Sequence, residues 1–375
     1  MIIGIDVGGT NTDAVLLGNE GIEKKFKEPT NSADLFQTIL TCLKKLLDNV
    51  DPKDVERIVL STTLTTNAIV QQKMEPVGMV VTAGPGINPA FFKCCEHYYC
   101  VSGSINHRGV EKEAVNESEI REAAAKIKEA GIEYVGVVGK FSVRNPVHEM
   151  QIKKILDDDF KQVFPGHHVS GNLSFPRRIS TTYINTGVFA LHKTFFEAIK
   201  KSLNEMGLSI PIRILKADGG TMTLEASMNF PGQTVLSGPA ASIMGAIPYA
   251  PEKIDTVVLD VGGTTTDIAF FVDKAPLLEP LGIQWGEYKS LIRSLWTESQ
   301  GIGGDSVVRV KDGKLSIGPD RKGPAMAFGG PEPTPTDALV VMGLMPADNS
   351  ENANKGIQEI AQQLGLDDIE AASMI

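Results

Sequence analysis

Two short apolar runs flank an acidic octet rich in glycine and threonine near the start of the chain, and the same arrangement returns near residue 260. The segments are, in chain order, residues 2–5, DVGGTNTD (6–13), residues 14–17, residues 257–259, DVGGTTTD (260–267) and residues 268–271. Short runs rich in Ile, Val and Phe are typical of strands, and paired glycines between them favour a tight turn. The pattern therefore predicts two β-hairpins, each with an octet at its tip.

Helical periodicity appears between the two octets. It predicts a helix at 118–130, with Ser118 as its N-cap and Gly131 as its stop, and a second helix at 146–159, after Asn145. Together with the predicted strands, these helices indicate an α/β protein.

The second half of the chain mixes helical and loop patterns. A long helical pattern runs from residue 182 to 206 and is closed by Gly207. Residues 318–336 are rich in proline and glycine and are expected to form a loop. The spacing of four apolar positions predicts a helix near the end: Ile357, Ile360, Ala361 and Leu364.

Composition narrows the class of protein. The 375 residues are 42% hydrophobic and 22% charged, which suits two or three domains that each bury a core. The formal net charge of −10 argues against a surface built for nucleic acid or an anionic membrane, so we expect neither as a partner. Four cysteines make no disulfide framework, and Met1 leads into an apolar strand without a leader pattern. A cytoplasmic protein is expected.

The octets carry the candidate chemistry. Paired glycines let a backbone approach an anion with its N–H groups turned inward, and threonines add hydroxyl donors. A Rossmann or Walker loop leads into a helix, and neither motif occurs at these sites. The nucleotide-binding candidates are Gly8, Gly9, Thr10, Asn11, Thr12, Gly262, Gly263, Thr264, Thr265 and Thr266. The alternative is a pair of purely structural turns, but a turn needs no such copying.

Four carboxylates bound the octets and are the catalytic candidates. Asp6 and Asp260 stand where a strand ends, a position from which each can hold Mg²⁺ directly or through its waters. Asp13 and Asp267 close the octets and can orient water or substrate, or else cap the turn.

Two copies of one phosphate hairpin resemble the arrangement of the actin, Hsp70 and sugar-kinase superfamily. That resemblance implies a two-lobed α/β ATPase fold of duplicated ribonuclease H-like domains, with the nucleotide in a cleft between the lobes. GIGGDSV at 301–307 adds to it, because in that superfamily a Gly-Gly loop that opens a helix lies against the nucleotide. The candidates there are Gly301, Gly303, Gly304 and Asp305.

Six further segments narrow the resemblance to the hydantoinase A and 5-oxoprolinase (N-methylhydantoinase A) family. They are STTLTTNAIVQQK (61–73), NPVHEMQIKKIL (145–156), RRISTTYINTGV (177–188), KADGGTMTLEAS (216–227), TVLSGPAASIMGA (234–246) and GPAMAFGGPEPTPTDALVVMG (323–343). The resemblance extends from residue 2 to about residue 346. The chain departs from the family at Ser61 and Asp305, where members often have glycine.

The resemblance implies an enzyme that uses ATP and Mg²⁺ to open a cyclic amide such as a hydantoin or 5-oxoproline. It implies a B-type hydantoinase subunit as partner and leaves homo-oligomer formation open. It also implies a lobe at 1–175 with the first phosphate hairpin and a second lobe at 182–375. The second lobe carries the other hairpin and the glycine-rich loop, and we expect it to be C-terminally truncated.

Residues after the predicted strand at 58–60 are candidates for the substrate site. Thr62, Thr63 and Asn67 either line the cleft or cap a helix. Ser237 and Gly238 of the LSGPA motif are added on the strength of the resemblance.

Three clusters have competing interpretations. Cys94, Cys95, His97 and Cys100 form a soft-metal cluster or, as we favour, unliganded thiols, because adjacent cysteines rarely bind one metal. Arg177 and Arg178 meet an anionic substrate or make surface ion pairs. His107-Arg108 and His167-His168 are expected in loops, solvated and not catalytic.

Two rival functions remain at this point. A ketone carboxylase subunit would phosphorylate a ketone or bicarbonate. A reactivating factor or chaperone-like switch would close on ATP without transforming a small molecule.

Overall fold

The computed structural model describes residues 1–8, 11–31, 33–70, 73–286, 288–347 and 349–375. The chain forms two compact units, Met1–Met244 with Leu278–Leu295, and Gly245–Leu277 with Trp296–Ile375. Residues 278–295 return to the first unit because β16 (Leu278–Glu279) pairs with β19 (Ser294–Leu295) and the Leu295 N–H donates to the Ala217 carbonyl. The predicted lobes at 1–175 and 182–375 group the chain differently and stay a prediction.

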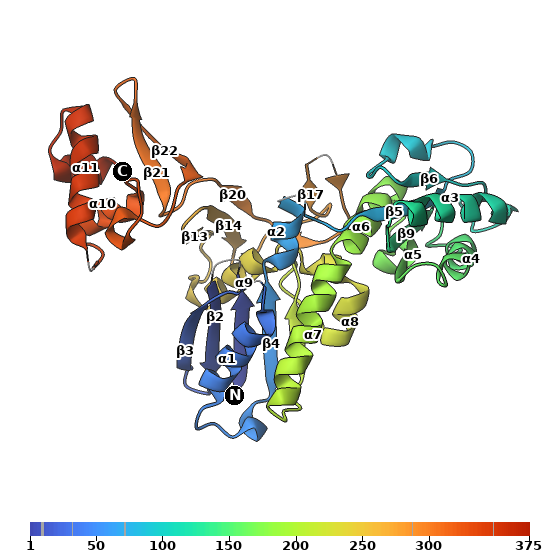
Figure 1. Cartoon of the computed structure of the whole chain (residues 1–375), viewed down its shortest axis with the longest axis horizontal. Coiled ribbons are helices and arrows are strands. Elements are labelled where there is room, and N and C mark those ends of the chain that lie inside the picture. The colour runs from blue at the N-terminus through green and yellow to red at the C-terminus, as the bar shows by residue number, and fades with distance from the viewer. Residues whose placement is uncertain (9–10, 32, 71–72, 287, 348) are drawn as a thin grey trace. The chain divides into compact units, whose positions relative to one another are not determined.

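The first unit contains a six-stranded sheet (Figure 1). Its strand order is β12 (Thr221–Thr223), β11 (Ile212–Leu215), β4 (Arg57–Thr62), β1 (Ile2–Val7), β2 (Asn11–Leu17) and β3 (Ile22–Pro29). Strand β1 pairs antiparallel with β2, which confirms the first predicted hairpin. Both β1 and β11 run parallel to β4, so the carboxyl ends of these three strands lie at one edge of the sheet.

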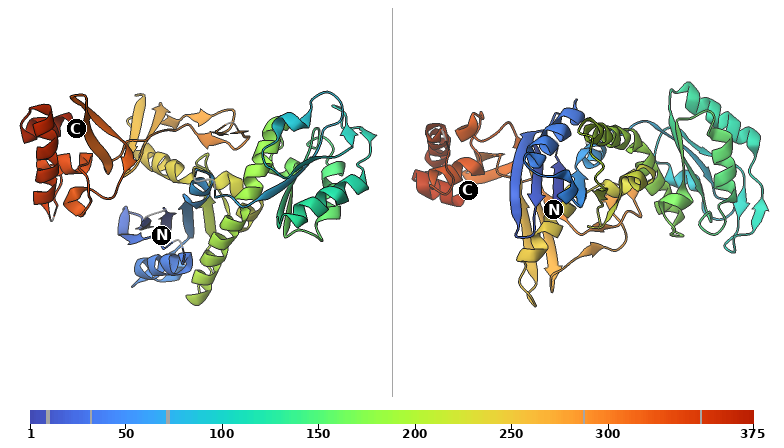
Figure 2. Two further views of the ribbon diagram at one scale, coloured as in Figure 1. Left: turned by 45° about the horizontal axis from the view of Figure 1, so that its top comes forward. Right: turned by 90° about the horizontal axis from the view of Figure 1, so that it is seen from below.

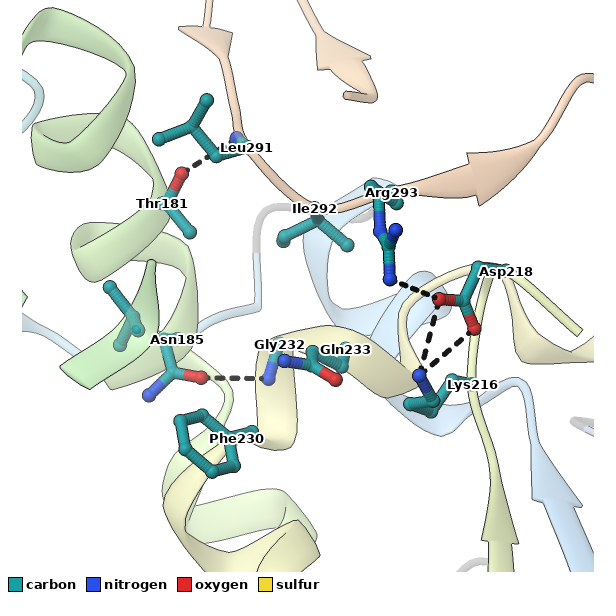
Figure 3. Close-up of a pocket in the computed structure, with 11 residues that line it drawn as sticks. Thr181, Asn185, Lys216, Asp218, Phe230, Gly232, Gln233, Leu291, Ile292 and Arg293 are labelled. Atoms are coloured by element: carbon teal, nitrogen blue, oxygen red, sulfur yellow. Dashed lines mark hydrogen bonds and ion pairs between the residues drawn. The ribbon is translucent and has the colours of Figure 1, made fainter. Parts of the chain in front are cut away.

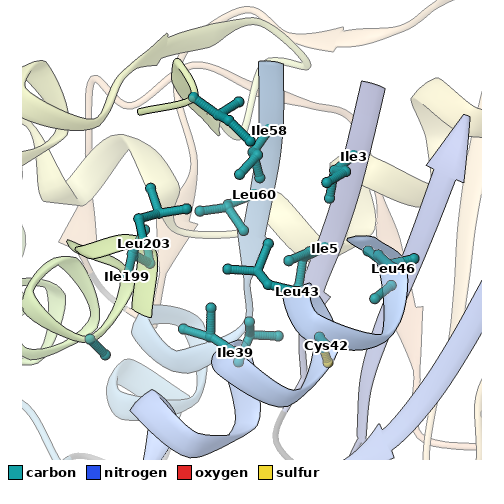
Figure 4. Packing of buried hydrophobic residues seen from close by; sticks show 14 of the residues in the cluster. Ile3, Ile5, Ile39, Cys42, Leu43, Leu46, Ile58, Leu60, Ile199 and Leu203 are labelled. Carbon is teal, nitrogen blue, oxygen red and sulfur yellow. The ribbon is translucent and has the colours of Figure 1, made fainter. Parts of the chain in front are cut away.

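Two helices, α1 (Leu35–Leu47) and α7 (Phe189–Glu205), cover one face of this sheet (Figures 1 and 4). Alternate residues of β1 point into the core, and Ile3 and Ile5 are buried there with Leu60 of β4. Leu43 of α1 and Leu203 of α7 close the cluster from the helical side. Burial of this apolar surface fixes which face of the first hairpin is turned inward.

A second sheet of the first unit is wholly parallel, with the order β10 (Gln162–Pro165), β9 (Tyr134–Gly139), β5 (Val77–Thr82) and β6 (Tyr98–Cys100). Helices α3 (Glu117–Glu129) and α4 (Val147–Leu156) pack on one face, and α6 (Phe175–Gly187) packs on the other (Figure 2). Both faces are therefore covered, which suits the continuous apolar composition of β5 and β9.

The predicted helices at 118–130 and 146–159 are confirmed as α3 and α4, with two differences at their ends. Asn116 rather than Ser118 is the N-cap of α3, because its side chain accepts the Ser118 N–H at 3.0 Å. Helix α4 ends at Leu156, earlier than expected.

The predicted helix at 182–206 is wrong as a single element. It consists of α6 and α7, and Val188 between them is the C-cap of one and the N-cap of the other. Helix α6 also begins earlier than expected, at Phe175, with a proline in its first turn, where a missing N–H costs nothing.

The first unit also contains shorter elements. They are α2 (Leu64–Val70), α5 (Gly166–Val169), α8 (Leu224–Asn229), the hairpin of β7 (Ser104–Ile105) and β8 (Glu111–Glu113), and that of β17 (Gln284–Trp285) and β18 (Tyr288–Lys289). Helix α9 (Ser237–Ala246) runs from the first unit into the second.

The second unit contains the other predicted hairpin, made of β13 (Thr256–Val261) and β14 (Thr266–Val272). Strands β15 (Ala275–Pro276) and β20 (Glu298–Gln300) both pair with β14. A long hairpin of β21 (Ser306–Lys311) and β22 (Lys314–Arg321) follows. The hairpin prediction is confirmed.

Three helices end the chain, α10 (Pro335–Val341), α11 (Ser350–Leu364) and α12 (Asp368–Met374), and their apolar faces share one small core. Helix α11 confirms the predicted helix at 357–364. The expected loop at 318–336 is wrong at both ends, since β22 reaches Arg321 and α10 starts at Pro335. Among the residues described, no helix combines the length and apolar character needed to cross a membrane.

Candidate active site

The described residues of the two octets share their strand pairing and one closing hydrogen bond. In the first, Asp6 is the cross-strand partner of Asp13; in the second, Asp260 is the partner of Asp267. The Gly8 N–H donates to the Asn11 carbonyl at 3.0 Å, and the N–H of Gly262 donates to the Thr265 carbonyl at 2.9 Å. A Cβ on Gly8 would lie 2.7 Å from the Asn11 carbonyl oxygen, so this turn requires glycine. The candidates Gly9 and Thr10 lie outside the described residues.

The first octet is held by the sheet around it. Asp6 accepts a hydrogen bond from the Ser61 hydroxyl on the parallel neighbour β4. Thr12 is buried, and its hydroxyl is hydrogen-bonded to that of Thr30 at 2.8 Å. Asp13 is half exposed and lies 3.2 Å from the Lys27 ammonium. The departure from the family pattern at Ser61 thus has a physical role, since a glycine there would give Asp6 no hydroxyl donor.

The second octet is held by the GIGGD loop. The N–H groups of Gly304 and Asp305 donate to the carbonyls of Gly262 and Gly263, at 2.9 and 2.7 Å. The Thr266 hydroxyl donates to the Ile302 carbonyl at 2.7 Å. These bonds bring the GIGGD loop next to the predicted phosphate turn. The other two predicted glycines of the loop, Gly301 and Gly303, lie on either side of Ile302 in sequence.

The GIGGD loop requires glycine for this approach. A Cβ on Gly303 would lie 2.6 Å from the Gly262 carbonyl oxygen. Contrary to the pattern of the superfamily, the loop leads into strand β21 and not into a helix. Val307 and Val308 are buried β-branched residues, and the Ser306 hydroxyl accepts the Gly303 N–H at 2.8 Å, which favours extended chain from there on.

The acidic groups around the second octet differ in environment. Asp260 is exposed, whereas Asp267 is partly buried and accepts a hydrogen bond from Ser299. Burial raises the pKa of the Asp267 carboxyl, the Ser299 bond opposes that rise, and the charge of Asp260 adds to it. Asp305, at the position where the family often has glycine, is paired with Arg321 at 2.7 Å.

The structure brings four of the five predicted substrate residues together. The Ser237 hydroxyl is buried, donates to the Thr62 carbonyl at 2.9 Å and accepts the Thr62 N–H at 3.3 Å. A Cβ on Gly238 would lie 2.7 Å from the Thr63 methyl group, so glycine permits this close approach. Ser237 therefore ties the LSGPA segment to the carboxyl end of β4. Asn67 lies in α2, and its side chain is outside what the structure describes.

A polar pocket that sequence reasoning missed follows the carboxyl end of β11 (Figure 3). Its cavity volume is about 70 Å³. Its polar lining comes from Thr181, Asn185, Lys216, Asp218, Gln233 and Arg293. The available signal was the KADGG motif directly after a predicted strand.

The interpretations of Arg178 as a substrate contact or a surface ion pair are wrong. Its side chain is fully buried and donates to the Ser142 hydroxyl at 2.5 Å and to the Gly139 and Lys140 carbonyls at 2.9 and 2.6 Å. Glu149, also fully buried, accepts the Gly139 N–H at 2.7 Å. These groups satisfy the carboxyl end of β9, so their role is structural.

His167 is not solvated as expected, because its ring and its N–H both contact Glu149. Its neighbour His168 is partly buried, and that burial, followed by the charge of His167, lowers the His168 pKa. Around Cys94, the described residues show no group of three His, Cys, Asp or Glu side chains able to hold a metal ion. Cys94 is buried and Cys100 exposed.

These hairpins, sheets and loops define a two-lobed α/β fold of the ATPase type. Over the whole chain the fold matches the acetone carboxylase in its nucleotide-free structure, with a TM-score of 0.78 at 20% identity, over 60% of that chain. It matches the ATP-dependent caprolactamase from Pseudomonas jessenii equally, with a TM-score of 0.78 at 24% identity, over 61% of that chain.

Two family models cover most of the sequence. The hydantoinase/oxoprolinase N-terminal region matches residues 2–160, and the hydantoinase/oxoprolinase model matches residues 178–375. The chain therefore belongs to the hydantoinase/oxoprolinase family.

Curated relatives include a caprolactamase subunit alpha from Pseudomonas jessenii, 26% identical over 92% of this chain and 54% of its own length. The acetophenone carboxylase gamma subunit from Aromatoleum aromaticum is 26% identical over all of this chain and 58% of its own length. A 5-oxoprolinase from Saccharomyces cerevisiae is 24% identical over 91% of this chain. The chain thus spans a little over half the length of the first two, and such relatives are hydrolases or subunits of carboxylases.

Proposed function

We propose that the chain is the A-type subunit of an ATP-dependent enzyme that opens a cyclic amide. The observation that carries the proposal is the duplication of one turn, with the same Asp–Asp pairing and the same glycine closure in both units. Backbone N–H groups of such glycine turns suit the oxygens of a polyphosphate. The Thr12 and Thr266 hydroxyls hold the turns, since they bond to Thr30 and to the Ile302 carbonyl. The expectation that the two hairpins share one ATP stays a prediction.

The carboxylates of the turns fit Mg²⁺ in the way that nucleotide enzymes use it. Mg²⁺ is usually held by one or two carboxylates together with substrate phosphates, not by a cage of protein ligands. Asp6 and Asp260 supply one carboxylate each, beside the glycine turn, and Asp260 is exposed. The ion would supply positive charge to offset the phosphates. Asp6 and Asp260 would hold it, and Ser61 would orient the Asp6 carboxylate for that task.

The reaction begins with activation of a poor electrophile. A lactam carbonyl is stabilised by resonance, so water attacks it slowly. Transfer of the γ-phosphoryl group from ATP to the lactam oxygen releases ADP and makes the ring carbon electrophilic. Water then adds, the ring C–N bond breaks, and a second water releases phosphate. This chemistry needs positioning and charge neutralisation more than a protein nucleophile.

A second candidate is a carboxylase subunit that phosphorylates a ketone or bicarbonate. It is favoured by the equal fold similarity to acetone carboxylase and by the match of the whole chain to the acetophenone carboxylase gamma subunit. In both candidate functions the phosphate turns would bind ATP, and only the acceptor of the phosphoryl group differs.

The test is phosphate release by the chain together with a B-type partner subunit. Release stimulated by 5-oxoproline, hydantoin or caprolactam supports the cyclic-amide hydrolase. Stimulation by acetone or acetophenone with bicarbonate, and not by lactams, supports the carboxylase. Stimulation by a protein alone contradicts both and favours a switch. A cytoplasmic location stays a prediction from the sequence.

A further inference from the structure

Two adjacent cysteines, Cys94 and Cys95, lie between the helical turn Pro89–Phe92 and β6. Both side chains pack on one apolar cluster, which residues of β5, β9 and α6 form together with Cys94 itself. Neighbouring side chains in an extended segment point to opposite sides, so a shared cluster shows that the chain bends between them. The bend places two thiols side by side before any reaction.

The two thiols differ in their access to solvent. Cys94 is buried and only 5% exposed, whereas Cys95 is partly buried. A small molecule that arrives from solvent therefore meets the Cys95 sulfur first, with the Cys94 sulfur behind it. This order suits a reaction in which one thiol attacks and its neighbour then replaces the leaving group.

The acidity of the two thiols follows the same order. A hydrogen bond from the Cys94 thiol is the main cause that lowers the pKa of Cys95, although burial opposes it. The charge of Lys93 and the backbone N–H of His97 lower the Cys95 pKa further. The bond between the thiols, followed by burial, raises the pKa of Cys94. Cys95 is therefore the thiolate, which is the nucleophilic form, and Cys94 keeps its proton.

The other two cysteines serve as comparisons within the same chain. Cys42 lies in the core of the first sheet, and burial raises its pKa to about 11. Cys100 is exposed on β6, yet the partial burial of its thiol raises its pKa. Both are therefore expected to react more slowly than Cys95.

We propose that Cys94 and Cys95 form a site of reversible oxidation, at which a peroxide joins the two side chains in a disulfide. The Cys95 thiolate attacks one peroxide oxygen, the O–O bond breaks, and hydroxide leaves as a sulfenic acid forms. The hydroxide takes the Cys94 proton and becomes water. The Cys94 sulfur then attacks the Cys95 sulfur, the S–O bond breaks, and a second hydroxide leaves. Two electrons pass from the sulfurs to the peroxide.

The disulfide of adjacent residues is expected to be easy to reduce. Consecutive Cα atoms are about 3.8 Å apart across a trans peptide, which is less than the roughly 4.4–6.8 Å of most disulfides. The ring therefore strains the peptide between the cysteines, and strained disulfides are the labile ones. A thiol such as dithiothreitol should restore both cysteines.

Closure of the ring also acts on a second segment. The Tyr288 hydroxyl of β18 donates to the Cys94 carbonyl at 3.1 Å, and this carbonyl belongs to the peptide that must turn. The Tyr288 ring lies 5.8 Å from the ring of Tyr183 on α6, measured between centroids. The oxidation is thus coupled to the hairpin of β17 and β18.

Mass spectrometry of the full chain tests the site with hydrogen peroxide as the probe. Cleavage after Lys93 and Arg108 releases residues 94–108, which contain three of the four cysteines. After peroxide this peptide should have lost two hydrogen atoms, and dithiothreitol should restore them. Cys42 should stay free for alkylation. A peptide that is unchanged, or that gains oxygen without losing hydrogen, would overturn the proposal.

Variants assign the two sulfurs. Cys100→Ser should form the disulfide at the same rate, and a disulfide that disappears in this variant would contradict the assignment. Cys94→Ala should stop at the sulfenic acid, which dimedone traps on Cys95 about tenfold or more faster than any adduct forms on Cys42. If Cys94→Ala does not fold, dimedone added to the unaltered chain during oxidation gives the same assignment by fragmentation. A first adduct on Cys100 would overturn the order of attack.

A pair of tyrosine variants tests the coupling to the hairpin. Tyr288→Phe frees the Cys94 carbonyl and should speed closure of the disulfide about fivefold, as expected for the loss of one hydrogen bond. Tyr98→Phe is the matched control, because it removes a bond to the Pro89 carbonyl at 2.8 Å in the same segment. Equal rates of closure in both variants would overturn the coupling.

Discussion

The two octet hairpins share the same Asp pairing and glycine closure but have opposite surroundings. Three apolar positions of β1 match positions of β13 in the repeat. In β1 they are buried: Ile3 is 0%, Ile5 3% and Val7 0% exposed. In β13 they are open to solvent: Val257 is 55%, Leu259 60% and Val261 64% exposed. Strand β1 lies inside a six-stranded sheet, whereas among the described residues β13 pairs with β14 alone. The apolar residues before each octet therefore serve different packing tasks.

This difference shows that the octet is not copied for packing. If the repeated sequence were kept only to make a stable turn, the same support around it would be expected. Instead the first turn is supported by an apolar core, and the second by backbone bonds from Gly304 and Asp305. What the two share is the glycine closure and the Asp pair, which are the parts that we propose bind a phosphate and its metal ion.

The largest contrast is expected in stability. Ile5→Ala removes buried methyl groups from the first core and should lower the free energy of unfolding by about 2–5 kcal/mol. Leu259→Ala, at the matching but exposed position, should change it by about 0.5 kcal/mol or less. Urea unfolding of both variants measures this, and equal losses would remove the contrast.

The support of the second turn by glycines predicts a smaller effect. Gly303→Ala places a methyl group against the Gly262 carbonyl and should cost about 1–3 kcal/mol, since the backbone must shift. Gly171→Ala, where a Cβ meets nothing within 4 Å, is the matched control. Hydrogen exchange should show faster opening at Gly304 and Asp305 in Gly303→Ala only. Unchanged exchange there would mean that the loop does not hold the turn.

Mild acid should change the stability of the regions around the two hairpins in different directions. Burial lowers the pKa of His192 to about 4, below its ordinary value, so the stability of the neutral ring is present above pH 6.5 and is lost as pH falls toward 4. His192 contacts Ser227 at 2.7 Å and lies on α7, over the first sheet. The loss at pH 5 is on the order of 2 kcal/mol.

The contribution of Asp267 to stability depends on pH in the opposite direction. Its pKa is raised by burial, so its contribution to stability is present at low pH and is lost as pH rises through that value. Hydrogen exchange at pH 7 and 5 should therefore show α7 opening more easily in acid and β14 no more easily. His192→Gln should abolish the acid effect on α7. An acid effect that persists in His192→Gln would have another origin.

Local patterns predicted the elements that depend on local chemistry. The hairpins followed from strand–turn–strand composition, and α3, α4 and α11 from periodicity. The break between α6 and α7 at Val188 was missed because the helical period of the sequence continues across it. The N-cap of α3 at Asn116 was missed because Asn116 and Ser118 are both suitable capping residues. The strand after GIGGD was missed because the expectation came from a resemblance and not from the alternating residues that follow.

The pocket was missed for a different reason. Lys216, Gln233 and Arg293 come from three separate segments, and only the folded chain brings them together. The interpretations of Arg178 as a substrate contact or a surface ion pair were wrong because sequence alone does not show that its guanidinium donates to carbonyls at the end of β9. Residues that act within one turn were thus predictable, and residues assembled from distant segments were not.

The central claim is that the octets bind phosphate and its metal ion, and Asp260→Asn tests it most directly. The change keeps the shape of the side chain and removes its charge, at an exposed site where stability should hardly change. In the complete enzyme we expect an unchanged melting temperature and a loss of about a hundredfold or more in substrate-stimulated phosphate release, with a smaller loss for Asp267→Asn. A folded Asp260→Asn enzyme that releases phosphate at the full rate would contradict the claim.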